Sequence, residues 1–259
     1  MIQLDLDVLK LFHQNMKLGK LQARKNLHLL PLSFFTRKIS LPTPVPSVDW
    51  YSKVPAWGMM KNDQLGDCTC AGVGHAILQW TTYAGTPKLL TDDQVVQTYM
   101  NFGYKPSDPS TDRGCVESDV LDYWKNTGVF GDKLANYVSV NPQDINEIKD
   151  AINWFGNVYT GIALPISAQS QQTWDVPSSG TQGTGAPDSW GGHCVIFVGY
   201  DDKTVTCVTW GGLKQMTWAF VRTYMDECYA LLNKDFINTA GTDPAGISWD
   251  ILNQNMQNL

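Results

Sequence analysis

The segment "KNDQLGDCTCAGVGHAI", residues 61–77, places two cysteines two residues apart where a polar turn meets a small-residue, apolar run. A thiol becomes a nucleophile when a helix N-terminus and an imidazole favour its thiolate, and nearby amide donors can hold the oxyanion that follows attack. Cys68 stands at the expected turn-to-helix junction, and Asn62 and Gln64 upstream are two alternative oxyanion donors. Cys70 lies further into the helix, where we expect burial. The pattern therefore indicates a Cys68 nucleophile whose pKa is depressed and which alkylates before the other thiols.

A thiol nucleophile needs a general base, and one of the four histidines is placed to be that base. His13 and His28 lie in the first 40 residues, away from the cysteine segment. His75 follows Cys68 by seven residues, about 10 Å along a helix axis, which is too far for a hydrogen bond. His193 ends a long polar, glycine-rich loop and opens an apolar strand, so its ring can project from a rigid edge.

A metal-binding interpretation of the same residues is weaker. Cys68, Cys70, His75 and His193 could supply four ligands, but Cys-x-Cys is not the usual zinc spacing and the histidines are dispersed. The glycines near the cysteines do not form a phosphate-binding pattern after a strand. We expect neither a metal nor a cofactor.

The elements that must position Cys68 and His193 divide into a helical half and a sheet half. Helices are expected over residues 69–83, from Thr91 with a Thr-x-x-Gln capping box, over 117–128, 146–156 and 216–237, and near the C-terminus after Asp243. Short strands are expected over 158–165, 193–201 and 203–211. Residues 176–192 form a long polar loop before the second strand.

The chain ends differ from the central body in charge and composition. Residues 1–40 carry seven basic and two acidic side chains, a charge of +5, and the whole chain carries -6, so the remainder carries -11. We expect residues 1–46 to form a basic arm, helical from about 5 to 25 with a proline-rich connector, followed by a body over 47–240 and a helical extension over 241–259. The arm is also apolar, so we expect it to dock on its own body or a neighbouring subunit rather than on nucleic acid.

No segment approaches the roughly 20 apolar residues that cross a bilayer, so no membrane partner is expected. The N-terminus lacks the pattern of an export signal. We therefore expect a location in the cytoplasm or within an assembled particle, with the six cysteines as free thiols.

Several segments, in order, resemble the papain-like cysteine peptidases. Residues 193–200, "HCVIFVGY", are similar to the segment that bears that family's catalytic histidine, and "VTWGG" at 208–212 is similar to its Asn-Ser-Trp-Gly. "VDWYSKV" followed by "KNDQLGDCTCAG", "LLTDDQVV" and "VYTGIALPIS" resemble other family segments, and the order agrees over roughly residues 45–212. The resemblance implies an α+β, papain-like fold, with a helical half and an antiparallel β-sheet half that meet at a cleft.

The resemblance also implies roles for particular residues. Cys68 would be the nucleophile and His193 the general base and later acid, with Asn62 at the family's oxyanion glutamine and Gln64 as the competing assignment. Trp210 would shield the histidine's hydrogen-bond partner from water. The family's histidine-orienting asparagine matches Val208, which has no polar side chain. Another acceptor is then required, and Thr209, a backbone carbonyl, a water or Asp188 are the candidates.

The leading functional hypothesis is a cysteine hydrolase that cleaves peptide or amide bonds through a thioester acyl-enzyme. Its substrate would be a peptide or protein. The alternative is a catalytically inactive papain-like fold that serves as a binding or structural component of a larger assembly such as a virus particle. For the arm, a further hypothesis is an inhibitory propeptide that lies across the cleft.

Overall fold

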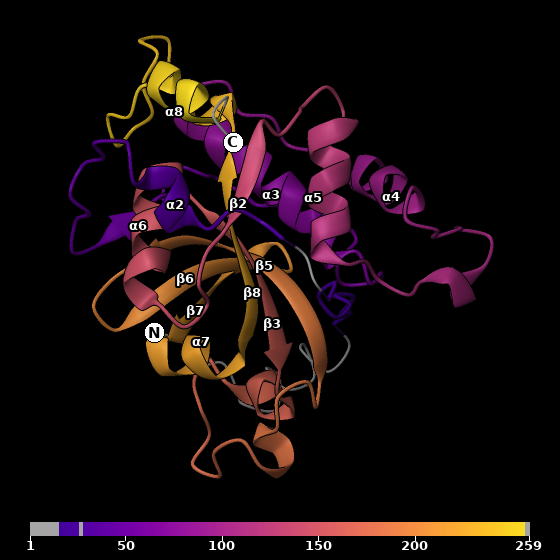
Figure 1. Cartoon of the computed structure of the whole chain (residues 1–259). Coiled ribbons are helices and arrows are strands. Elements are labelled where there is room, and N and C mark those ends of the chain that lie inside the picture. Colours follow the sequence, from indigo (N-terminus) through magenta and orange to yellow (C-terminus); the bar gives the residue numbers. More distant parts are fainter. Residues whose placement is uncertain (1–15, 26–27, 257–259) are drawn as a thin grey trace.

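The structure is a computed structural model that describes residues 16–25 and 28–256. Figure 1 shows helices α3 (Cys68–Tyr83), α4 (Asp92–Met100) and α5 (Glu117–Asn126) grouped on one side of a curved sheet. The other helices are α2 (Leu32–Thr36), α6 (Ile145–Phe155), α7 (Trp218–Tyr224) and α8 (Trp249–Met256), with short 3-10 turns at Pro109–Thr111, Ile166–Ser170, Gly183–Gly185 and Lys234–Phe236. The fold is α+β, as the sequence predicts.

The strands form one large, mostly antiparallel sheet. They are β1 (Val48–Asp49), β2 (Asn136–Ser139), β3 (Val158–Leu164), β4 (Thr173–Trp174), β5 (Gly191–Tyr200), β6 (Thr204–Thr209), β7 (Gly212–Thr217) and β8 (Met225–Leu232). Their order in the sheet is β2-β8-β3-β5-β6-β7-β4, with β1 paired to β5, and among the strands of the described residues only the pair β4 and β7 is parallel. Strands β3 and β5 are thus central, which explains why both are buried along most of their length.

Helix α3 is buried over nearly its whole length because the sheet covers one side and α4 and α5 lie beside it. Small residues allow this close packing. A Cβ added at Gly72 would lie 2.9 Å from the Tyr159 ring of β3, and one at Gly74 would lie 2.6 Å from the Met60 sulfur. The helix that begins at Cys68 is therefore fixed rigidly against the sheet that carries His193.

Two predicted helices are wrong over part of their length, and of the helix expected over 216–237 the structure keeps α7 (Trp218–Tyr224). Residues 225–232, expected inside a helix over 216–237, form strand β8 between β2 and β3, because pairing on both edges overrides the helix preference of its Ala and Leu residues. Residues 16–25, expected in the helix over 5–25, run without helical structure. Residues 5–15 of that expected helix lie outside the described part of the chain.

Other predicted elements are confirmed. Helix α4 begins with the full capping box, in which the Thr91 side chain accepts from the Gln94 amide and the Gln94 side chain accepts from the Thr91 amide. The helices at α3, α5 and α6 and the strands β3, β5 and β6 lie where the sequence places them. Among the described residues, no helix has the length and apolar character needed to span a bilayer.

Candidate active site

Cys68 is the first residue of α3 and lies where the helix meets the sheet. The backbone N–H of Cys194, in β5, donates to the Cys68 sulfur at 3.4 Å. A helix N-terminus has backbone N–H groups without partners inside the helix, and these favour a negative charge. The structure therefore brings Cys68 against Cys194, the residue that follows His193, although 126 positions separate the two cysteines in sequence.

His193 is fully buried and its ring is held on two sides. Its Nε2 forms a 2.7 Å hydrogen bond with the Thr209 hydroxyl, and its ring stacks on Trp210 with centroids 4.5 Å apart and planes 17° apart. Its Nδ1 has no hydrogen-bond partner in the described part of the chain. When Nε2–H donates to Thr209, Nδ1 carries the lone pair that can accept a proton.

Strand alternation explains why Thr209, and not the aligned Val208, contacts the histidine. Successive side chains of β6 point to opposite faces, so Val208 enters the core that contains Ile196 while Thr209 points to the other face. Trp210 and Gly211 then form a two-residue turn with positive φ values of 46° and 71°. A non-glycine residue with positive φ is strained, and here that conformation accompanies the placement of the indole against His193.

Asp188 does not take the orienting role among the described residues. It is exposed, has a positive φ of 62°, and its backbone N–H donates to the Ala163 carbonyl. The two candidate oxyanion donors also differ in placement. Asn62 is buried and donates from Nδ2 to Asp67, the residue before Cys68, at 3.2 Å, whereas Gln64 is exposed and contacts Asp63.

Residues 17–21 pack against the segments that carry Cys68 and His193 and cover the thiol. The Lys20 amide donates to the Gly192 carbonyl at 3.0 Å, and the Cys115 amide donates to the Gly19 carbonyl at 2.8 Å. The Trp210 indole N–H donates to the Lys17 carbonyl at 3.2 Å. A Cβ added at Gly19 would lie 1.8 Å from the Gly66 carbonyl oxygen, so the segment passes directly against the turn before Cys68.

This cover changes the expected electrostatics of the thiol. The sequence predicts a depressed pKa for Cys68, but burial raises its pKa to about 12, although the N–H groups of Cys194 and Gly19 act to lower it. Burial likewise lowers the pKa of His193 to about 3. The predicted depression is wrong for this covered state, because the backbone N–H groups cannot offset the loss of solvent around a thiol that is 1% exposed.

Two charged residues at the site, Asp67 and Lys20, are not predicted from the sequence patterns. Asp67, directly before the candidate nucleophile, is fully buried, and burial raises its pKa to about 8. Lys20 is buried with its ammonium 2.9 Å from both Asp226 and Glu227. In sequence Lys20 is one of several basic residues between 17 and 25, and its acidic partners lie too far along the chain to be inferred from spacing.

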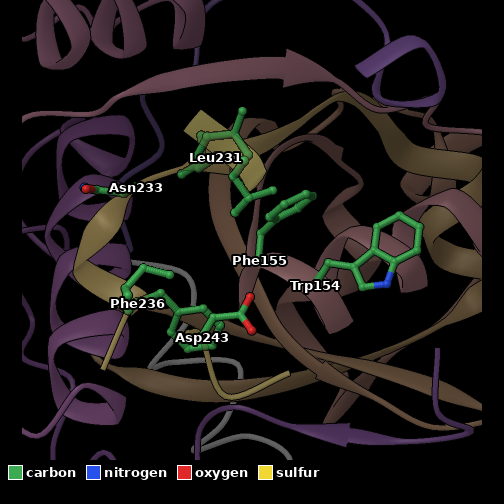
Figure 2. A pocket seen from close by; sticks show the side chains of 9 residues that line it. Trp154, Phe155, Leu231, Asn233, Phe236 and Asp243 are labelled. Atoms are coloured by element: carbon green, nitrogen blue, oxygen red, sulfur yellow. The ribbon is translucent and has the colours of Figure 1, made fainter. Parts of the chain in front are cut away.

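The six cysteines are free and buried, and no cluster of three or more metal-ligating side chains occurs among residues 16–25 and 28–256. Figure 2 shows a small hollow lined by Trp154, Phe155, Leu231, Phe236 and Asp243. None of its lining residues belongs to the cleft of Cys68 and His193, so the hollow is separate from the candidate site.

Comparisons with solved structures agree on one fold. Xylellain, a cysteine protease from Xylella fastidiosa, superposes with a TM-score of 0.63 and 13% identity, covering 85% of this chain and 97% of its own. Digestive procathepsin L 3 from the larval midgut of Tenebrio molitor gives 0.56 and 15%, covering 88% of this chain and 79% of its own. Procathepsin B S9 from Trypanosoma congolense gives 0.56 and 12%, covering 86% and 88%.

No protein-family model matches the sequence, and a comparison with curated protein sequences gives no match. The structural likeness at this identity defines the fold: the chain has the fold of the papain-like cysteine proteases.

Proposed function

We propose that the chain is a latent cysteine hydrolase of peptide or amide bonds, with Cys68 as nucleophile and His193 as general base. The observation that carries this proposal is the environment of His193. Its Nε2 is engaged by Thr209 and its ring face by Trp210, while its Nδ1 is left without a partner in the described part of the chain. A ring held in this way presents one basic nitrogen in a fixed direction, which is what a general base requires.

The proposed reaction begins when residues 17–21 leave the cleft and water enters. The pKa of the thiol then falls and that of His193 rises, since burial is the main cause of both displacements. The Cys68 proton moves to Nδ1 of His193, and the sulfur attacks the substrate carbonyl to form a tetrahedral oxyanion. The backbone N–H of Cys68 and the second amide hydrogen of Asn62 are the proposed donors to that oxyanion.

The intermediate collapses when His193 donates its proton to the leaving amine, and a thioester remains on Cys68. Water then attacks the thioester carbonyl as His193 removes its proton. The acid is released, and the sulfur recovers a proton from His193. Thr209 replaces an amide as the group that fixes the ring, so it supplies orientation through a hydroxyl.

The test uses a full-chain variant in which the cleft is open. Gly19→Val should expel the segment, because its Cβ cannot coexist with the Gly66 carbonyl. We expect this variant to hydrolyse fluorogenic peptides and to gain one adduct with a peptidyl epoxide, located on Cys68 by mass spectrometry. Cys68→Ala and His193→Ala in the same background should abolish both. An opened, folded variant that forms no adduct and cleaves no peptide or amide would end the hydrolase proposal and leave the fold.

The second candidate is a non-catalytic binding component. It is favoured by the burial of Cys68, which is 1% exposed beneath Gly19 in the full chain. Under this hypothesis Cys68→Ala leaves the biological role intact, whereas the hydrolase requires the thiol.

A further inference from the structure

A pocket beside the candidate nucleophile holds a lysine side chain. Lys20 enters it with only 2% of its side chain exposed, and its ammonium lies 2.9 Å from Asp226 Oδ2 and 2.9 Å from Glu227 Oε1. Glu117, fully buried in the first turn of α5, acts on the same ammonium and helps to raise the pKa of Lys20. Two carboxylates of the sheet half thus pair directly with one cation, and the Glu117 carboxyl of the helical half, whose pKa is raised well above its ordinary value by burial, acts on it electrostatically.

The sheet register builds this pocket next to the catalytic strand. Cys194 of β5 pairs with Gly161 of β3, and Gly161 pairs with Glu227 of β8, so the three residues form one row across the sheet. Gly161 leaves the space that the lysine crosses, because a Cβ there would lie 2.0 Å from Cε of Lys20. Tyr229 donates to Glu227 Oε2 at 2.6 Å and so leaves Oε1 for the ammonium.

The acidic groups of this pocket are buried, so a cation also offsets the cost of keeping them away from water. Glu117 and Glu227 are 0% and 5% exposed, and neither oxygen of Glu117 has a hydrogen-bond partner in the described part of the chain. Buried carboxylates without a counter-charge are strongly disfavoured as anions. An apolar side chain of similar length would leave them unpaired, whereas a lysine or arginine side chain compensates them.

We infer that the pocket of Glu117, Asp226 and Glu227 over Gly161 selects peptides with a lysine or arginine side chain, and that Lys20 is its resident occupant. This inference rests on the proposed function for its meaning as substrate specificity. The main-chain bonds of the same segment, from the Lys20 amide to Gly192 and from Cys115 to the Gly19 carbonyl, show how a bound peptide is aligned beside Cys68.

The test measures binding and hydrolysis separately. The binding protein is the full chain with Lys20→Glu, which empties the pocket, and Cys68→Ala, which removes the thiol. The probes are labelled peptides of the chain's own sequence, Leu-Gly-X-Leu, with X as Lys, Arg, Met or Glu, followed by fluorescence anisotropy. We expect the Lys and Arg peptides to bind at least tenfold more tightly than the Met peptide, with the Glu peptide weakest.

Two pocket variants sharpen the result. Glu227→Gln should reduce the preference for Lys over Met to below threefold without weakening the Met peptide, and Gly161→Val should abolish binding of the long side chains by filling their path. If Lys20→Glu does not fold, Lys20→Ala removes the cation without adding an acid and takes its place. Equal binding of Lys and Met peptides, or no effect of Glu227→Gln, would overturn the inference.

Hydrolysis is then followed with the same peptides, carrying a fluorogenic amide, in the Lys20→Glu background with Cys68 intact. Selective binding without hydrolysis would refute the proposed function and retain the basic-side-chain pocket. Hydrolysis without a preference for Lys or Arg would refute the basic-side-chain pocket and retain the proposed function.

Discussion

Lys20→Glu should turn Cys68 from a protected thiol into a reactive one in the full-length chain. Lys20 holds residues 17–21 over the cleft through Asp226 and Glu227, and the substitution replaces these attractions with repulsion. Removing one partner of a buried ion pair typically costs about 3–5 kcal/mol. If the segment opens and closes faster than alkylation proceeds, this change raises the open population about 150- to 5,000-fold.

The thiolate fraction of Cys68 sets an upper limit on how much its alkylation rate can increase. A pKa of about 12 in place of 9.0 lowers the thiolate fraction at pH 7.5 about a thousandfold. Opening the cleft should therefore accelerate alkylation of Cys68 by about 10²- to 10³-fold, with the loss of burial supplying most of the gain.

The assay is a time course of iodoacetamide labelling at pH 7.5, with each cysteine peptide quantified by mass spectrometry. Lys25→Glu is the matched control, because it makes the same charge change at an exposed position four residues beyond the segment, and it should leave the rate within twofold. Gly19→Val should reproduce the acceleration by a steric route. The reasoning fails if Cys68 stays unlabelled in both variants while proteolysis shows that the segment has been released. Equal labelling of Cys70 and Cys68 would instead indicate general unfolding.

The remaining predictions concern groups around the thiol. In the opened Gly19→Val background, Thr209→Val should lower kcat/KM about 5- to 150-fold, because a lost hydrogen bond to buried His193 costs about 1–3 kcal/mol. Thr209→Ser keeps the hydroxyl and should retain most of the activity. Equal rates for the Val and Ser variants would contradict the orienting role of Thr209. Asn62→Ala should lower kcat about 10²- to 10³-fold, whereas Gln64→Ala, at an exposed position, should leave kcat unchanged. Steady-state kinetics measure both variants, and a larger loss of kcat for Gln64→Ala would contradict the assignment of Asn62. Asp67 has a raised pKa of about 8 in the folded chain against an ordinary 3.8, so the folded state binds the extra proton; its contribution to stability is full below pH 4 and declines by on the order of 5 kcal/mol as the pH rises to 8. Urea unfolding at pH 5 and pH 8 should therefore show a smaller decline for Asp67→Asn than for the unchanged chain, and parallel declines would count against it.

The sequence predicts the two elements that carry the candidate pair more successfully than the contacts that control it. Cys68 is the first residue of helix α3, and His193 lies near the start of strand β5. Both elements have apolar patterns that are local and strong, so the sequence predicts them. The ion pair of Lys20 with Asp226 spans 206 positions, so no spacing rule reveals it. The sequence offers Thr209 as one of several acceptors for His193, and the choice depends on which face of β6 its side chain occupies. Only the pairing of the strands fixes that register.

The misassigned strand β8 is part of the same difficulty. Residues 225–232 contain Ala and Leu residues that favour a helix, but pairing with both β2 and β3 makes them a central strand. That strand delivers Asp226 and Glu227 to the cleft. A helix there would place them elsewhere, so the acidic pocket could not be inferred until the sheet order was known.

The contacts of Lys20 link the two proposals physically. Its amide binds the Gly192 carbonyl directly before His193, and its ammonium binds the acidic pocket, while its neighbour Gly19 covers the thiol. A peptide side chain that takes the lysine's place must therefore break the contact that keeps Gly19 over Cys68. Basic peptides can compete for the pocket and neutral ones cannot, because a cation pairs with Asp226 and the buried Glu227 as Lys20 does, whereas a neutral side chain leaves Glu227 without that partner. It follows that the full chain should discriminate between basic and neutral peptides more strongly than a variant already opened at Gly19, since only in the full chain does the side chain that gains the pocket also uncover the nucleophile.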